Sequence, residues 1–347
     1  MQNNILPKHI KKGHQLVFSR QDLSAREADL FALVVAFMKP TDWDHKTPQY
    51  EFACANLAQW LNIESKHVGF VLTPTASRLS ERRVGIKDDS NGEFDFIPLF
   101  KRMKYAKGVL TIIPNDELKN EYIAYNQGFA LINTANFLGL KREYSKRLYE
   151  LLSRFKGGGG TKLKAQSIIE LKGLFGILDE SDKLKIDKKS FSNTSVFMQR
   201  CIRESITELM ENTNTKKDIM FLPGNDKNFG FTTLKAGKRI TSVEFLYHWI
   251  DKDAENGINQ KYAEDTIKNL ELKRLTSKIK LPIVELKDLA AAYIFLGKTV
   301  QGERVLESVN QREKEPESEN EEVIISNIDS ILEKINQLKE IQGDIEY

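Results

Sequence analysis

The alternation of apolar and polar positions is most regular near the middle of the chain, in residues 140–156. Apolar side chains recur there at three- and four-residue spacings, at Leu140, Tyr144, Leu148, Leu151, Leu152 and Phe155. On a helix with 3.6 residues per turn, these positions form one stripe. The basic residues lie toward the other side, at Arg142, Lys146, Arg147 and Arg154. The pattern predicts an amphipathic helix that ends at the four glycines of residues 157–160.

The segments that follow this helix predict the order strand, helix, helix, strand hairpin. This is the order of a winged-helix domain, a variant of the helix-turn-helix that binds DNA. The long helix has one packing side, formed by Phe197, Met198, Cys201, Ile202, Ser205 and Leu209. The expected elements are a strand at residues 161–166, a helix at 167–176, a polar loop at 179–194, a long helix at 195–212, and strands at 218–222, 229–234 and 239–249, with a wing turn at 235–238.

The first part of the chain predicts a similar order of elements. Residues 1–20 are basic and poorly periodic, which is typical of an arm that becomes ordered only on a partner. Ser24 and Glu27 form a capping box, so a helix should run over residues 25–38 and end before Lys39-Pro40. The further elements are a strand at residues 51–53, a helix with Leu57, Trp60 and Leu61, a helical stretch at 65–83 broken at Thr73-Pro74, strands at 94–103 and 109–113 around a turn at 105–108, and a connection at 114–136 with a short helix and strand.

One motif in these patterns resembles a known family. The run Tyr-Ser-Lys-Arg-Leu-Tyr-Glu-Leu at residues 144–151, with residues 168–176 and 197–213 behind it, is similar to the Rep_3 family of plasmid replication initiators. The likeness covers roughly residues 10–250. It implies two winged-helix domains that bind repeated origin sequences, called iterons. It also implies recruitment of host replication proteins such as a helicase, and dimers that often repress their own gene.

We therefore predict an α+β protein with tandem winged-helix domains and a helical, partly disordered C-terminal tail. Residues 251–310 are charged and helical in pattern, and residues 311–322 are rich in Glu. The expected parts are a basic arm at residues 1–20, a first winged-helix domain at 21–137, a second at 138–250, a helical extension at 251–310, and an acidic linker with a short amphipathic or heptad helix at 311–347.

Charge divides the chain unevenly. The net charge is +3, but residues 301–347 carry −8 and residues 1–300 carry +11. A basic body favours a polyanion partner. In the acidic segment, residues 324–345 keep a spacing that fits either a heptad seam for association or an amphipathic helix that docks on its own body.

The candidate DNA-binding residues fall into two groups. In the second domain, Arg and Gln on the outward side of the long helix can read bases, whereas lysines in the loop and the wing suit phosphates. In the first domain, the arginines fit equally well as charges at a helix end. The candidates are Lys188, Lys189, Asn193, Gln199, Arg200, Arg203, Thr207, Lys235 and Lys238 in the second domain, and Lys66, His67, Arg78, Arg82 and Arg83 in the first.

Other classes of function find little support in the residues. The five histidines show no paired spacing for a metal, and residues 292–299 lack the small residues of a phosphate loop. Cys54 and Cys201 lie in apolar helical patterns, so we expect no disulfide and a bacterial cytoplasmic location, and no run is long enough to span a membrane. We expect no catalysis, cofactor or metal. The alternatives are a winged-helix repressor without a role in replication and an enzyme that nicks the origin through Tyr144 or Tyr149.

Overall fold

A computed structural model gives the fold of the chain. It describes residues 5–44, 46–88, 93–123, 125, 128–156, 162–250, 260–276 and 280–312. The described residues fall into two compact units that divide between residues 259 and 260. Within the described ranges, no helix is long and apolar enough to cross a membrane.

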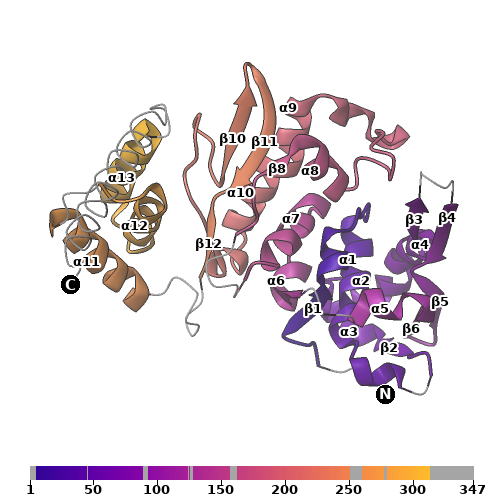
Figure 1. Cartoon of the computed structure of the whole chain (residues 1–347). Helices are drawn as coiled ribbons and strands as arrows, with labels where there is room; N and C mark the ends of the chain where they lie inside the picture. The colour runs from indigo at the N-terminus through magenta and orange to yellow at the C-terminus, as the bar shows by residue number, and fades with distance from the viewer. Residues whose placement is uncertain are drawn as a thin grey trace, which may run out of the picture. The chain divides into compact units, whose positions relative to one another are not determined.

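The first unit begins with one winged-helix set (Figure 1). Its strand β2 pairs antiparallel with β6, and β6 pairs with β5. Strand β2, which follows α2, therefore forms a three-stranded sheet with the β5–β6 hairpin. The hairpin turns at Lys107 and Gly108, both at positive φ, within the turn that the sequence predicts. The set consists of α2 (Ala25–Phe37), β2 (Tyr50–Ala53), α3 (Cys54–Trp60), α4 (Val68–Glu81), β5 (Phe100–Ala106) and β6 (Val109–Pro114).

A second set repeats this order and this pairing. Its strand β8 pairs with β11, and β11 pairs with β10, as β2, β6 and β5 do in the first set. The fold is therefore the tandem winged-helix arrangement that the sequence predicts. The set consists of α7 (Glu143–Ser153), β8 (Gln166–Ser167), α8 (Ile168–Leu174), α9 (Thr194–Phe197), the π-helical segment η5 (Met198–Arg203), α10 (Glu204–Glu211), β10 (Phe231–Ala236) and β11 (Arg239–Phe245).

Shorter elements join and flank the two sets. The predicted strand at residues 239–249 is in fact two strands, because the chain leaves β11 at Leu246 and β12 (Tyr247–Trp249) pairs with β9 (Ile219–Phe221) instead. The others are η1 (Pro40–Trp43), η2 (Ser65–His67), η3 (Asp116–Leu118), α5 (Lys119–Ile123), α6 (Thr134–Leu138), η4 (Ile186–Ser192) and η6 (Thr215–Lys217).

Two predictions for the first set are wrong. The helix does not break at Thr73-Pro74, because Pro74 lies inside α4, where Val68, Leu72 and Leu79 stay buried on both sides of it. A proline removes one donor from a helix, and here the packed stripe outweighs that loss. The expected single strand at residues 94–103 is β4 (Glu93–Pro98) followed by β5, and β4 pairs with β3 (Arg83–Asp88).

The prediction of an arm at the N-terminus is also wrong for residues 9–18. They form strand β1 (His9–Gly13), which pairs antiparallel with β7 (Phe129–Asn133), and helix α1 (His14–Phe18). Ile10, Leu16 and Val17 are buried. These three apolar side chains attach the segment to the core, although the basic residues between them hide the pattern in the sequence.

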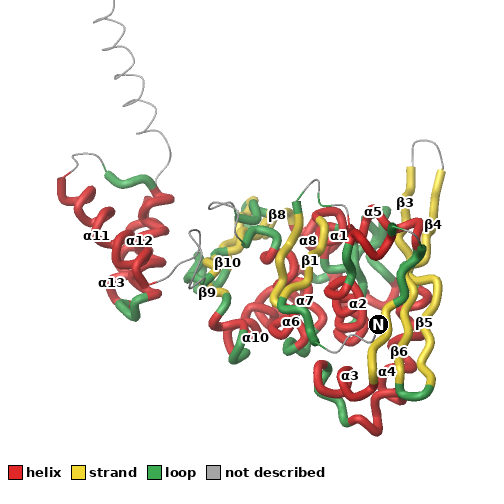
Figure 2. Tube along the Cα trace, turned by 90° about the horizontal axis from the view of Figure 1, so that it is seen from below, coloured by secondary structure: helices red, strands yellow, loops and turns green. Residues whose placement is uncertain are grey.

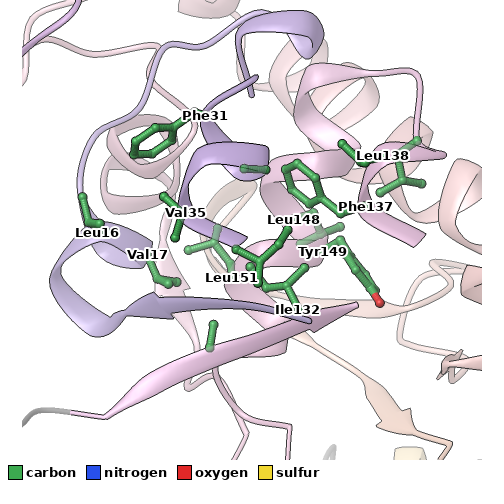
Figure 3. Packing of buried hydrophobic residues seen from close by; sticks show 14 of the residues in the cluster. Leu16, Val17, Phe31, Val35, Ile132, Phe137, Leu138, Leu148, Tyr149 and Leu151 are labelled. Carbon is green, nitrogen blue, oxygen red and sulfur yellow. The ribbon is translucent and has the colours of Figure 1, made fainter. Parts of the chain in front are cut away.

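Helix α7 is the centre of the first unit (Figure 3). Its Leu148 and Leu151 are fully buried and face residues of α2 and β7 such as Val35 and Ile132, whereas the buried Tyr149 ring contacts Trp249. One hydrophobic core runs through both winged-helix sets. The two sets are therefore packed together, and α7 is covered on more than one side.

This packing corrects the prediction for the basic side of α7. Lys146 and Arg147 are buried, with Lys146 only 1% exposed. Lys146 Nζ lies 2.6 Å from Asp29 Oδ1 of α2, so a buried ion pair joins the two sets. Arg147 pairs with Glu150, which also pairs with Lys12 of β1. The sequence pattern placed these residues only on the side opposite the apolar stripe, because their partners Asp29 and Lys12 lie far away along the chain.

The described residues of the second unit, 260–276 and 280–312, form the helices α11, α12 and α13 (Figure 2). They are helical as predicted: α11 (Gln260–Thr276), α12 (Ile283–Phe295) and α13 (Thr299–Arg312). They share a core of their own, formed by Leu281, Leu286, Leu289, Ala290, Val305 and Val309. The heptad pattern of residues 324–345 lies outside the described residues, so both interpretations of it stay predictions.

Candidate nucleic-acid interface

The outward surface of the second set is formed by one continuous helical segment, the recognition helix, defined as α9, η5 and α10 together. The side chain of Asn193 accepts a hydrogen bond from the Ser195 amide at 2.8 Å and caps its start. Phe197, Cys201 and Leu209 are fully buried, as predicted from their spacing. The packed stripe turns the opposite side outward, and Gln199, Arg200, Arg203 and Thr207 are all exposed.

A π-helical segment lies in the middle of the recognition helix and contains Gln199, Arg200 and Arg203. Such segments are rare and occur often at functional sites. Arg203 Nη2 donates a hydrogen bond to Asn228 Oδ1 at 2.9 Å, and its guanidinium lies 5.5 Å from the centre of the Phe231 ring. Arg203 is therefore held in place by the loop and strand of the hairpin region before any partner binds.

The outward residues are divided by charge. Gln199 and Thr207 line a groove of ≈ 510 Å³ together with Glu204, Glu208 and Glu211. Glu208 accepts hydrogen bonds from the amides of Lys141 and Arg142, and Glu204 pairs with the Arg142 side chain. Lys141 and Arg142 line the same groove, so its charges are mixed, whereas Arg200 and Arg203 add positive charge alone to their part of the helix.

The predicted phosphate-binding lysines have different surroundings. Lys188 is only 15% exposed and lies 3.3 Å from Asp22 and 3.7 Å from Glu143. Burial lowers the pKa of Lys188, but the carboxylates of Asp22 and Glu143 outweigh it and raise this pKa above its usual value. Lys188 thus links the segment before α2 to α7, and its assignment as a phosphate contact stays a prediction.

The other three lysines are exposed. Lys189 lies in η4 and Lys238 at the turn of the β10–β11 hairpin, beside Gly237 at positive φ. Lys235 pairs with Asp226 on the same surface. An exposed pair of this kind contributes little to stability and can exchange for a phosphate. Lys189, Lys235 and Lys238 therefore remain candidates.

In the first set, Arg78 and Arg82 are held by a buried acid. Arg78 Nε donates to Glu27 at 2.9 Å, and Arg82 Nη2 donates to the same carboxylate at 3.1 Å. Burial would raise the pKa of Glu27, but its hydrogen bond with the Ser24 amide and the two guanidinium groups bring it below its usual value. Both arginines thus stabilise the start of α2, and their assignment as DNA contacts stays a prediction.

The other candidates of the first set lie on the surface. Lys66 and His67 are exposed and face Glu64, at 3.0 and 3.6 Å. Arg83 is exposed at the start of β3. The prediction missed Lys104 and Lys107, which are exposed on the β5–β6 hairpin. Their signal is present in the sequence, because Lys107-Gly108 marks a hairpin turn and a wing tip can reach phosphates.

Comparison with known proteins supports the resemblance to replication initiators. Residues 9–153 match the family model described as initiator replication protein, WH1. A replication initiation protein of Escherichia coli is 26% identical over 143 residues, which is 41% of this chain and 45% of that protein. The chain thus matches less than half the length of this relative. Both matches agree with the resemblance predicted from the sequence, over residues 9–153 for the family model.

A solved structure agrees with the fold. The Pi initiator protein, determined in complex with iteron DNA, superposes with a TM-score of 0.54 and 16% sequence identity. The match covers 72% of this chain and 100% of that one. At this identity the likeness shows a shared fold.

Proposed function

We propose that the chain is a plasmid replication initiator that binds repeated duplex sequences at an origin and promotes its opening. The observation that carries this proposal is the repeated winged-helix set in one packed unit. Each set exposes a helix and a basic hairpin, so one molecule can hold two neighbouring parts of a DNA site.

The contacts divide by chemistry. Arg200 and Arg203 are exposed on the recognition helix, and arginine can bind guanine O6 and N7 with two hydrogen bonds. Lys238 and Lys107 are exposed at the two hairpin turns, where a flexible ammonium suits phosphate oxygens. Base contacts would then select the site, and the hairpins would fix the register of the protein on it.

The wider role rests on the comparisons. A match to a replication initiation protein and a fold shared with an iteron-bound initiator support binding to iterons. We extend the proposal to association into dimers, repression of its own gene, and recruitment of host replication proteins such as a helicase. We place this activity in the bacterial cytoplasm.

The proposal contains no catalytic step. Tyr149 is fully buried, and its hydroxyl donates to the Asp218 carboxylate. Burial and the Asp218 charge raise the pKa of Tyr149, and burial raises that of Tyr144, so both are poor nucleophiles. Supercoiled origin DNA incubated with the protein and Mg²⁺ should yield no covalent adduct. An adduct that disappears in Tyr149→Phe or Tyr144→Phe would establish a nicking enzyme instead.

A maintenance assay tests the role in replication. A plasmid without an origin, carrying this gene and its flanking DNA, is introduced into the bacterium from which the gene comes. We expect stable plasmids with the wild-type gene and none with the Arg200→Ala/Arg203→Ala variant. If the plasmid is lost but a reporter behind the gene's own promoter is repressed, the protein is a winged-helix repressor.

A further inference from the structure

Helix α4 exposes a large aromatic side chain on its outward stripe. Phe70 is 85% exposed, and the same stripe carries Thr73, Pro74 and Ser77, all of them exposed. The buried stripe of Val68, Leu72 and Leu79 fixes this orientation. In the winged-helix order, α4 occupies the position that the recognition helix has in the second set.

A second aromatic side chain lies beside this stripe, on the hairpin. Tyr105 of β5 is 39% exposed, and its Cε1 lies 2.8 Å from the position that a Cβ on Gly69 would occupy. A side chain at residue 69 would push the Tyr105 ring aside, so the glycine lets the ring lie close against α4. The hairpin and the helix form one surface here, with Phe70 next in sequence to the point of contact.

The surroundings of Phe70 are mostly basic. Lys66, His67, Lys104 and Lys107 are exposed on η2 and on the hairpin. Glu64 faces Lys66 and His67, and Glu81 lies at the far end of α4. A surface ion pair such as Lys66–Glu64 is weak, so Lys66 can bind a phosphate instead.

Two partners could cover an exposed phenylalanine, and the observations favour DNA. A protein interface has an apolar core with few charges. Phe70 instead shares its stripe with the small or polar side chains of Thr73 and Ser77, and basic residues lie on the neighbouring η2 and hairpin. A duplex offers a matching pattern, because its major groove presents single thymine methyl groups among polar base edges, between two rows of phosphates.

We propose that Phe70 is a specificity-determining residue that contacts a thymine methyl group in the DNA site. The small side chains of Thr73 and Ser77 let the helix approach the base edges, and Lys66 and Lys107 hold the phosphates on either side. The second set reads guanine through arginines, whereas the first set reads thymine through an apolar contact. This inference rests on the proposed function, and it goes beyond it by assigning a base and a chemistry to the first set.

The experiment removes single methyl groups from the DNA. The full chain first enriches its preferred duplex from a random pool, and each thymine of that duplex is then replaced in turn by uracil. We expect at least one replacement to weaken wild-type binding about fourfold, the effect of losing one buried methyl group. Phe70→Ala should bind the thymine duplex about tenfold more weakly and show no further loss with uracil at that position. Phe70→Leu should keep the response to the methyl group.

Controls separate this contact from folding and from the wider proposal. Leu275→Ala removes an equally exposed apolar side chain in the second unit and should change neither affinity nor the methyl response. The unfolding midpoint of Phe70→Ala should equal that of the wild type. An unchanged methyl response in Phe70→Ala overturns the inference, and so does a changed oligomeric state of this variant in light scattering with unaltered DNA binding. If the wild-type chain enriches no duplex at all, the proposed function itself fails.

Discussion

At the scale of single residues, Arg200 and Arg203 lie three positions apart on the recognition helix but differ in their supports. Arg203 is held by Asn228 and Phe231, whereas Arg200 is exposed. Replacement of either by Ala should cost about 1–3 kcal/mol of binding free energy on the preferred duplex and much less on random DNA. Asn228→Ala removes the hydrogen bond that holds Arg203 and should weaken the DNA contact of Arg203 only. The Arg203→Ala substitution should therefore cost less binding free energy in the Asn228→Ala variant than in the wild type. Band-shift titrations measure the affinity of each variant for the preferred duplex and for random DNA. Equal losses on the two DNAs would show that the arginines contact phosphates and not bases.

A half-buried histidine, His248 of β12, is expected to make the second set sensitive to acid. Burial lowers the pKa of His248 from 6.5 to about 3, with a smaller effect from the Lys162 charge. Its Nε2 is buried without a hydrogen-bond partner among the described atoms. As the pH falls, His248 takes up a proton near pH 6.5 in the unfolded chain but only near pH 3 in the folded chain. The free energy of unfolding is therefore highest above about pH 6.5 and decreases as the pH drops toward 3.

The measurement compares unfolding at two pH values. Between pH 6.5 and 5.5 the free energy of unfolding of the wild type should fall by about 1 kcal/mol more than that of His248→Gln. His67→Gln serves as the control, because His67 is exposed and its replacement should keep the wild-type dependence. Equal pH dependence in wild type and His248→Gln would contradict the assignment.

The sequence predicted which way side chains point more reliably than what they contact. The spacing of Phe197, Cys201 and Leu209 correctly places Arg200 outward, because the orientation follows from the helix period alone. The partners of Arg78 and Lys188 lie 51 and 166 residues away along the chain, at Glu27 and Asp22. Such pairs form only when the two sets pack, so the sequence could not distinguish these side chains from free cations.

At the scale of elements, local rules predicted the beginnings and turns of most segments. The capping box at Ser24 starts α2, and the turn at Lys107-Gly108 ends β5. These features depend on residues within four positions of one another. Strand β1 and the unbroken helix α4 depend on distant packing, and for that reason the pattern misjudged both.

Lys238 on the β10–β11 hairpin and Lys188 in η4 should contribute differently to the salt dependence of DNA binding. Lys238 is exposed at the turn of β10–β11, whereas Lys188 is engaged by Asp22 and Glu143. Lys238→Ala should weaken binding to every duplex and lower the salt slope by roughly one. Lys188→Ala should leave the slope unchanged and reduce the stability of the fold. Titrations at several salt concentrations decide this, and a reduced slope in Lys188→Ala would show that Lys188 leaves its partners for a phosphate.

At the scale of the whole molecule, one buried ion pair connects the two winged-helix sets. Lys146 of α7 and Asp29 of α2 are both buried, and Lys146 also donates to the Phe137 carbonyl at 2.7 Å. Asp29→Asn leaves the ammonium without its counter-charge and should lower the free energy of unfolding by about 3–5 kcal/mol. The Asp29→Leu/Lys146→Met double variant should recover most of this loss.

Chemical unfolding tests the ion pair directly. Glu64→Gln is the matched control, because it breaks the exposed pair with Lys66 and should change stability by less than about 0.5 kcal/mol. If Asp29→Asn is as mild as Glu64→Gln, the pair is not what joins the sets. The sequence could not indicate this link, since Lys146 occupies the polar side of an amphipathic pattern.

The central claim is that two winged-helix sets in one chain bind repeated duplex sequences, and protection of DNA from hydroxyl radicals tests it most directly. The DNA that flanks the gene is cleaved in the presence of increasing amounts of the full chain. We expect several protected blocks at a fixed period, each longer than one winged-helix domain covers, and their joint loss in the Arg200→Ala/Arg203→Ala variant. A single protected block would indicate a repressor, and protection without any period would contradict the claim.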